Sequence, residues 1–255
     1  MKRMIPALML GLMVSGQAAA EALTLAVPED AYPPYVIHDQ QGQAVHGLLI
    51  DPLRKALQEL DVDLVLEELP ILRSRPMLEA GQVDGRMESS YWAPDANRYL
   101  WLDAGVWLED VLLYRNDLSF QPLSMAAVHG SEVIAHLGYR YPALDPLFEA
   151  GFLTRIDRAD ENSMIDALLH APGDSERLLV IERGVWDWYA ARTDIPIHIR
   201  IEQSPVTVGC APLQIQLADT PRLRELQPRI QAILNRNRGA SAAGCASALS
   251  ENQAR

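Results

Sequence analysis

The sequence is poor in cysteine and in basic residues, and beyond its first 20 residues it contains no long apolar run. It has 34 acidic but only 22 basic residues, which gives a net charge of −12 at pH 7. Nucleic acids and anionic membrane surfaces bind to basic faces of proteins, and this composition does not favour such a face. We therefore expect neither a nucleic acid nor an anionic membrane as a partner.

Motifs for catalysis and metal binding are also missing. The six histidines include no H-x-x-x-H pair and the two cysteines form no C-x-x-C motif, so no metal site follows from their spacing. The sequence also has no G-x-S-x-G motif and no glycine-rich phosphate loop. It thus indicates no cofactor and no particular enzymatic reaction.

The first 20 residues have the layout of a secretory signal peptide. Lys2 and Arg3 precede an apolar run over residues 4–14 and small residues at 18–20, where an A-x-A cleavage site is expected. The apolar run is too short for a permanent membrane anchor, and no cysteine lies near the cleavage site to carry a lipid. We expect a soluble protein that begins near Glu21 and resides in a Gram-negative periplasm.

The two cysteines, Cys210 and Cys245, would meet an oxidising environment in that compartment. We expect a disulfide between them that ties the C-terminal tail to the body of the protein. Two free, unrelated thiols remain the alternative. The tail, residues 241–255, follows a shift in composition toward alanine, serine and glycine, which predicts loose packing.

The rest of the chain alternates strand-like and helix-like segments, which is typical of an α/β fold with mostly parallel strand pairing. The predicted strands cover residues 23–27, 63–67, 83–87, 100–115, 132–137, 177–181, 195–201 and 206–217. The predicted helices start at Asp51, as an N-cap, and cover 71–80, 142–150, 161–170, 184–192 and 221–237, the last broken by Pro228.

The order of motifs along the chain resembles that of bacterial extracellular solute-binding proteins of family 3, the polar amino-acid type. The motifs are YPPY at 32–35 after the first strand, HGLLID at 46–51 before a helix, and EAGQVDG at 79–85 before the next strand. Each motif is weak alone, but their ordered spacing behind a signal peptide is specific. The resemblance covers nearly all of the mature chain.

The resemblance implies an α/β type II periplasmic-binding-protein fold, in which two α/β lobes are joined by two crossing hinge segments and close on a ligand. The implied lobes are 22–111 plus 203–240 and 112–202, with hinge strands near 109–113 and 202–206. A ligand would lie between the lobes, beyond the carboxyl ends of the strands.

The tyrosines of the YPPY motif are the first expected ligand contacts. The two prolines fix the backbone and remove two N–H donors, so this loop is stiff and suits a stacking surface. In the resembled family an aromatic residue here packs against the ligand, and we favour Tyr32 over Tyr35. The alternative is that a tyrosine only fills the core.

A carboxylate clamp is the second expectation from the resemblance. An arginine suits this role because its planar guanidinium forms two parallel bonds to a carboxylate. Arg98 occupies the corresponding place, although Asp95 stands where the family has a hydroxyl residue. An Arg98–Asp95 surface pair is the alternative, and Arg73 and Arg86 are reserve candidates. The implied contacts in this region are Ser89, Ser90, Tyr91 and Arg98.

Two further segments would complete the site from the second lobe. The turn of Gly138, Tyr139 and Arg140 would present backbone N–H groups, a helix N-terminus and a positive charge to the ligand's anionic end. Glu182 would receive the ligand's ammonium group, or Arg183 would face the ligand if the alignment shifts by one residue.

The function implied by the resemblance is capture of a small, polar, carboxylate-bearing ligand, such as an amino acid, for an ABC transporter permease. The protein would act as a monomer, without a cofactor. Two alternatives remain. One is a dehydratase-like periplasmic enzyme with Glu182 as acid and base, and the other is a sensory module that presents its ligand to a membrane receptor.

Overall fold

A computed structural model describes residues 21–116, 120–172, 175–238 and Cys245. The expected signal peptide, residues 1–20, and the tail, residues 241–255 apart from Cys245, lie outside the described residues. Within the described part of the chain, no helix is both long enough and apolar enough to cross a membrane.

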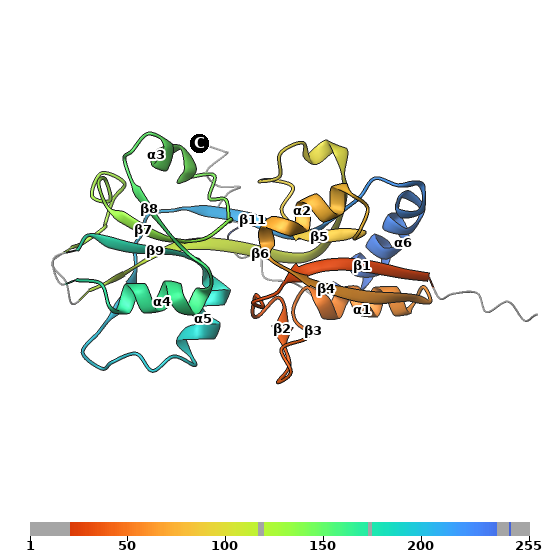
Figure 1. The fold of residues 1–255 in the computed structure, drawn as a ribbon, viewed down its shortest axis with the longest axis horizontal. Helices are drawn as coiled ribbons and strands as arrows, with labels where there is room; N and C mark the ends of the chain where they lie inside the picture. The colour runs from red at the N-terminus through yellow and green to blue at the C-terminus, as the bar shows by residue number, and fades with distance from the viewer. Residues whose placement is uncertain (1–20, 117–119, 173–174, 239–244, 246–255) are drawn as a thin grey trace, which may run out of the picture.

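The strands form one large mixed sheet with helices on both faces (Figure 1). The sheet order is β4-β1-β5-β11-β6-β9-β7-β8, with β10 paired to the end of β6, and β2 and β3 form a separate hairpin. The strands are β1 (Glu21–Pro28), β2 (Ile37–His38), β3 (Ala44–His46), β4 (Val62–Leu69), β5 (Gly85–Glu88), β6 (Leu100–Arg115), β7 (Glu132–His136), β8 (Thr154–Arg158), β9 (Arg177–Glu182), β10 (Ile201–Gln203) and β11 (Gly209–Leu217). The helices are α1 (Ile50–Gln58), α2 (Ile71–Glu79), the 3-10 helix η1 (Ala96–Arg98), α3 (Asp145–Glu149), α4 (Glu161–Leu169), α5 (Arg183–Ala190) and α6 (Pro221–Asn237).

The elements gather in two halves, seen at the right and left of Figure 1. The first half contains β1, β4 and β5 with α1, α2 and α6, and the second contains β7, β8 and β9 with α3, α4 and α5. Pairing inside each half is parallel between β1 and its neighbours β4 and β5, and between β7 and its neighbours β8 and β9. Antiparallel β6 and β11 lie between these parallel sets.

β6 connects the two halves. Its first part pairs with β11 from Leu100 to Asp110, and its last part pairs with β9 from Asp110 to Leu113. Asp110 is therefore the residue at which the strand exchanges one main partner for the other. The chain returns to the first half between β10 and β11.

The buried residues explain why the halves keep this arrangement. In β1, Leu23 and Leu25 point to the side of α1, and Ala26 packs with Leu78 of α2 on the other side. Both faces of the strand are covered, which explains its continuous apolar sequence. The largest buried cluster includes side chains from both halves, and two smaller clusters lie in the second half with the central strands and beside α2.

The YPPY loop is held by the segment that leads into α1. The backbone N–H of Tyr32 donates to Val36 at 2.9 Å, and the bond between the two prolines is cis. The N–H of Leu49 donates to the Tyr35 carbonyl at 3.2 Å. Gly47 allows this approach, because a Cβ there would lie 2.1 Å from the Tyr35 carbonyl oxygen and the residue has φ +143°.

Several predicted elements differ from the observed ones. The predicted strand over 195–201 is wrong, since only its last residue belongs to a strand, β10. The helix predicted from 142 starts three residues later, where Asp145 accepts the Tyr141 N–H at 3.2 Å. β8 was not expected from the sequence, and α1 begins at Ile50 without a side-chain cap rather than at an Asp51 N-cap. α6 also continues through Pro228.

Cys210 and Cys245 form a disulfide with an S–S distance of 2.02 Å. Cys210 lies in β11, opposite Glu109 of β6, so the bond joins the residue beyond α6 to the strands between the halves.

Candidate functional site

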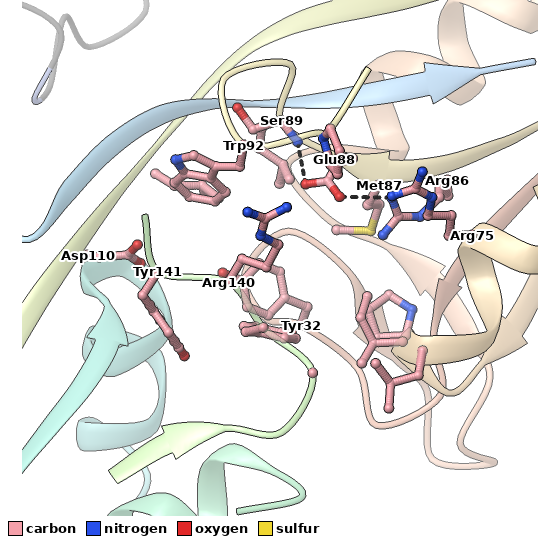
Figure 2. Close-up of a pocket in the computed structure, with 18 of the residues that line it drawn as sticks. Tyr32, Arg75, Arg86, Met87, Glu88, Ser89, Trp92, Asp110, Arg140 and Tyr141 are labelled. Atoms are coloured by element: carbon pink, nitrogen blue, oxygen red, sulfur yellow. Dashed lines mark hydrogen bonds and ion pairs between the residues drawn. The ribbon is translucent and has the colours of Figure 1, made fainter. Parts of the chain in front are cut away.

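A cavity of about 400 Å³ lies between the two halves, where β1, β5 and β7 end (Figure 2). The carboxyl ends of strands are the usual ligand position in α/β sheets. The lining consists of Pro28 at the end of β1 and Tyr32 after it; Ile71, Leu72, Arg75 and Pro76 of α2; residues 86–89, Trp92 and Pro94; Leu108, Asp110 and Leu213 of the central strands; and residues 138–141 after β7.

Aromatic rings form much of the wall. Tyr32 of the first half meets Tyr139 of the second, with ring centroids 6.0 Å apart in an edge-to-face arrangement. Tyr139 in turn stacks on His136 at 3.9 Å. Trp92 and Tyr141 line the cavity as well. These rings give the cavity an apolar surface that bridges both halves.

One side of the cavity contains a satisfied ion pair. Arg86 of β5 is 8% exposed, and its guanidinium lies 2.8 Å from the Glu88 carboxylate. It also donates to Ser74 at 2.9 Å and to Gln216 at 3.0 Å. A buried arginine without such partners would be costly, so these contacts explain how a charged residue is tolerated in this strand.

Arg140 is a basic residue that reaches into the cavity without a partner among the described residues. Figure 2 shows its guanidinium between Tyr32 on one side and Trp92 and Glu88 on the other. It makes no hydrogen bond or ion pair with any described residue. Arg75, at the edge of the same cavity, is instead bonded to Glu79 at 2.9 Å. Arg140 is therefore available to an anionic ligand.

A second arginine, Arg155, holds the backbone of the turn that carries Arg140. Arg155 of β8 donates to the carbonyl oxygens of His136 and Tyr139, each at 2.9 Å. The turn begins with Gly138, whose φ is +82°. The expected helix N-terminus is not directly behind this turn, because α3 starts only at Asp145.

Asp110 supplies a buried acid on the side of the cavity formed by the central strands. Its side chain is 9% exposed and lies at the opposite side of the view from Arg75 and Arg86 (Figure 2). Burial, together with the nearby charge of Glu182, raises the pKa of this carboxyl to about 7. The sequence reading did not select Asp110, although an aspartate amid the apolar residues of β6 was a visible signal.

Half of the predicted contact residues line this cavity. These are Tyr32, Ser89, Gly138, Tyr139 and Arg140. Ser89 is buried, and its backbone N–H donates to Glu88 at 2.9 Å. The predicted contacts Ser90, Tyr91 and Arg98 do not line it.

Arg98 is found in the alternative arrangement. Its side chain is 67% exposed and lies 3.8 Å from the Asp95 carboxylate. Both residues belong to the short turn around η1, which directs them to the surface. Tyr91 is also exposed and contacts Trp107 edge to face at 6.3 Å. The reserve candidate Arg73 is exposed, whereas Arg86 lines the cavity.

Glu182 and Arg183 lie outside the cavity between the halves. Glu182 caps α5, since its carboxylate accepts the Val185 N–H at 2.9 Å and the Glu109 N–H at 3.2 Å. Burial raises its pKa, and the backbone N–H groups and the Tyr35 hydroxyl oppose that rise. Arg183 makes two bonds of 2.8 Å to Glu109. Both residues have structural partners in place of a ligand.

A second cavity, of about 440 Å³, lies beside these residues near the disulfide. Tyr35, Glu109, Glu182, Arg183 and Cys245 are among its lining residues. The YPPY tyrosines are thus divided, with Tyr32 at the first cavity and Tyr35 at the second. Among the described residues, no three acidic, histidine or cysteine side chains gather closely enough to hold a metal ion.

Comparison with known proteins shows similarity at the level of the fold. No family model and no curated protein sequence matches the chain. A truncated, arginine-bound ArgBP from T. maritima is 15% identical, with a TM-score of 0.67 over 85% of this chain and 96% of that one. The amino acid ABC transporter substrate-binding protein AbpA from Streptococcus pneumoniae, bound to L-arginine, is 12% identical, with a TM-score of 0.65 over 84% and 88%. The ancestral amino acid-binding protein AncCDT-1, a precursor of cyclohexadienyl dehydratase, is 16% identical, with a TM-score of 0.65 over 84% and 88%.

The chain therefore has the type II periplasmic-binding-protein fold, as the sequence resemblance predicted. These structures are consistent with the resemblance to family 3 solute-binding proteins. At such low identity they establish the architecture, whereas the ligand has to be argued from the cavity itself.

Proposed function

We propose that this protein is an exported solute-binding protein that captures a small carboxylate-bearing compound between its two halves and delivers it to an ABC permease. The observation that carries the proposal is Arg140, a cation that points into an aromatic cavity between the halves and has no partner among the described residues. A guanidinium binds a carboxylate with two parallel, charge-assisted bonds.

The two halves would act as the moving lobes. The proposed boundaries are 22–111 plus 203–240 for the first and 112–202 for the second. Residues from both halves line the cavity, so a ligand there would contact both and favour the closed state by its additional contacts. The aromatic wall of Tyr32, Trp92 and Tyr139 would pack against the apolar part of the ligand.

A thermal-shift screen tests this proposal directly. A ligand that binds only the folded protein raises the melting temperature as its concentration exceeds Kd. Amino acids, dicarboxylates and small cyclic acids form the panel, and the compounds that stabilise the protein are then measured by calorimetry. We expect at least one carboxylate-bearing compound to bind.

Arg140→Ala should reduce the affinity for that compound by about 10- to 100-fold, because a bond to a charged group contributes roughly 1.5–3 kcal/mol. Arg229→Ala is the matched control, since Arg229 is an exposed arginine of α6 outside the cavity. Equal affinities of Arg140→Ala and the wild type would exclude the clamp. Conversion of a bound compound to a product would instead support the enzymatic alternative, and an adjacent permease gene would favour transport over sensing.

A further inference from the structure

Arg155 contacts the turn of residues 138–141 from outside the cavity. It belongs to β8 and is not part of the cavity lining. Its side chain is 22% exposed, so most of it is removed from water. A guanidinium in such a place is tolerated only where its donors meet acceptors. Arg155 can therefore act on the turn, but it cannot touch a compound in the cavity.

Two hydrogen bonds join Arg155 to the backbone before Arg140. Its Nη2 atom donates to the carbonyl oxygens of His136 and Tyr139, each at 2.9 Å. His136 is the last residue of β7, and Tyr139 directly precedes Arg140. One nitrogen atom thus ties the end of the strand to the residue before Arg140, and this restricts the path of the chain between them.

Further contacts hold the guanidinium itself in place. Its Nε donates to Asp157 of the same strand at 2.8 Å, and its Nη1 lies 3.5 Å from Asp145 of α3. The group also lies over the rings of Tyr141 and Phe148, 5.5 and 5.7 Å from their centroids. Arg155 therefore connects β8, the turn and α3.

Arg140 depends on its neighbours for its position. Neither its backbone nor its side chain forms a hydrogen bond or ion pair with any described residue. On one side, the Tyr139 carbonyl is held by Arg155, and on the other, the Tyr141 N–H donates to Asp145 at 3.2 Å. A group that binds a ligand through directional bonds has to be held within about 0.5 Å of its productive geometry. The direction of Arg140 thus follows from the bonds of the residues beside it.

We propose that Arg155 is a positioning residue for ligand binding, which holds the turn in the conformation that directs Arg140 into the cavity. This inference rests on the proposed function and adds to it a residue that lies outside the cavity. Without the donors of Arg155, the turn would sample other conformations. Binding would then have to restore the one that faces the cavity, and this ordering lowers the affinity.

Calorimetric titration of Arg155→Met tests the role of the donors. Methionine keeps a flexible apolar chain but donates no hydrogen bond. Arg158→Met is the matched control, since Arg158 is also in β8 and its side chain donates to the Asp157 carbonyl at 2.9 Å and to no group of the turn. The probes are L-arginine, L-leucine, L-phenylalanine and succinate. For the probe that the wild type binds most tightly, Arg155→Met should lower the affinity about 5- to 20-fold. Arg158→Met should lower it by less than about twofold.

A double-mutant cycle separates positioning from a general effect on the fold. If Arg155 acts through Arg140, Arg155→Met should change the affinity of the Arg140→Ala variant by less than about twofold, because no guanidinium remains to be positioned. A role in the fold alone would lower the affinity by the same factor with and without Arg140. Arg155→Lys should weaken binding less than Arg155→Met does, since an ammonium group has donors for both carbonyls.

Hydrogen exchange measures the hold on the turn without any ligand. The backbone amides of residues 137–141 should exchange faster in Arg155→Met than in the wild type, by about tenfold or more. They should exchange at the wild-type rate in Arg158→Met. Equal rates in all three proteins would overturn the inference, because the turn would then keep its conformation without Arg155.

The outcomes separate this inference from the proposed function. If a probe binds the wild type and Arg155→Met equally, or if the loss is the same with and without Arg140, the positioning role is overturned and the solute-binding function stands. If no probe binds the wild type, the function and the inference are both rejected, whatever the exchange rates. Should Arg155→Met fail to fold, the same cycle with Arg155→Lys decides, with a smaller loss expected only where Arg140 is present.

Discussion

At the scale of single residues, Glu161 is a second buried acid whose ionisation opposes folding. It is 3% exposed, and its carboxylate lies 3.9 Å from Nε2 of His136. Burial raises the pKa of Glu161 to about 7, with smaller contributions from Asp160 and Asp30, while it lowers the pKa of His136. Both shifts favour the neutral form, so the pair is not a strong ion pair.

The raised pKa of Glu161 predicts a pH dependence of stability. The folded protein holds the Glu161 proton at higher pH than the unfolded chain does, so protonation of Glu161 stabilises the folded state. This contribution to the unfolding free energy is complete below the ordinary glutamate pKa and is lost as pH rises to about 7. Glu161→Gln keeps the shape of the neutral side chain, so the unfolding free energy of this variant should depend less on pH. Between pH 7.5 and 5.5, the wild type should gain about 1–2 kcal/mol more unfolding free energy than the variant.

Urea unfolding at the two pH values measures this difference. Glu225→Gln, at an exposed position of α6, is the control for a removed charge and should follow the wild type. Parallel pH profiles of Glu161→Gln and the wild type would show that Glu161 does not titrate in this range.

The sequence was less informative about individual side chains than about their segments. Glu182 has the residue type and place of an ammonium acceptor in the resembled family, but local backbone N–H groups engage it. Asp110 of β6 lies opposite Glu182 of β9 in the register of these two strands. A linear sequence cannot show which of two neighbouring acids is satisfied by the fold, because that depends on backbone groups from other elements.

At the scale of elements, Pro228 shows how tertiary packing overrides a local signal. A proline inside a helix removes one backbone hydrogen bond and predicted a break. α6 nevertheless runs unbroken over 17 residues. Its apolar face, including Leu226 and Ile230 on either side of the proline, is buried in the core, so the helix is retained despite the lost bond.

Replacing Pro228 should therefore stabilise the protein. The side chain is exposed, so Pro228→Ala loses little packing and regains a backbone N–H. We expect the unfolding free energy to rise by about 1–3 kcal/mol, which chemical denaturation can measure. Arg229→Ala is the control, because it changes the next exposed side chain without adding a backbone N–H donor. It should change the unfolding free energy little. A destabilised Pro228→Ala would mean that the proline relieves a strain in α6.

Elements with a clear apolar period were predictable, and those fixed by side-chain contacts were not. The buried positions of α1 and α4 follow helical spacing, so both helices were expected. β8 has no fully buried residue and lacks that signal. The segment before β10 is apolar in sequence, yet Ile197 is fully exposed, so composition alone misled the prediction.

At the scale of the whole molecule, the two halves touch at the mouth of the cavity. A Cβ added to Gly138 of the second half would lie 2.8 Å from Cδ2 of Leu72 and 3.1 Å from Cγ2 of Ile71, both in the first half. The Leu72 side chain is otherwise 62% exposed. A glycine at this contact permits the observed closeness of the halves.

Gly138→Ala should accordingly disfavour the closed arrangement and weaken ligand binding by about tenfold or more, because the added methyl clashes across the cavity mouth. In the presence of ligand, small-angle scattering should give a larger radius of gyration for Gly138→Ala than for the wild type. Gly130→Ala is the matched control, since Gly130 has a similar φ of +88° and no atom within 4 Å of an added Cβ.

The double variant Gly138→Ala/Leu72→Ala removes the clash and should recover most of the affinity. If the double variant does not recover the affinity, and if Gly130→Ala and Gly138→Ala lose equal affinity, the weaker binding comes from backbone strain. It would then not come from the contact between the halves.

The overall architecture was more accessible from the sequence than the site was. Local patterns around YPPY and Gly138 indicated an α/β fold, and the resemblance of the motif order to a known family predicted the type II fold that the structural comparisons show. The cavity depends on which side chains from distant segments meet. The sequence identified Arg98 as a candidate by its position in the chain, but it did not show the direction of the side chain, which lies beside Asp95 at the surface.

The position of Trp92 gives the molecule an optical signal of its own. All five tryptophans belong to the described residues, and Trp92 alone among them lines the cavity between the halves. A compound entering there would displace water from the indole and alter its fluorescence emission, while the indoles outside the cavity supply a steady background. Occupancy could thus be followed in unlabelled protein, at micromolar concentration and in real time, before the identity of the natural ligand is known.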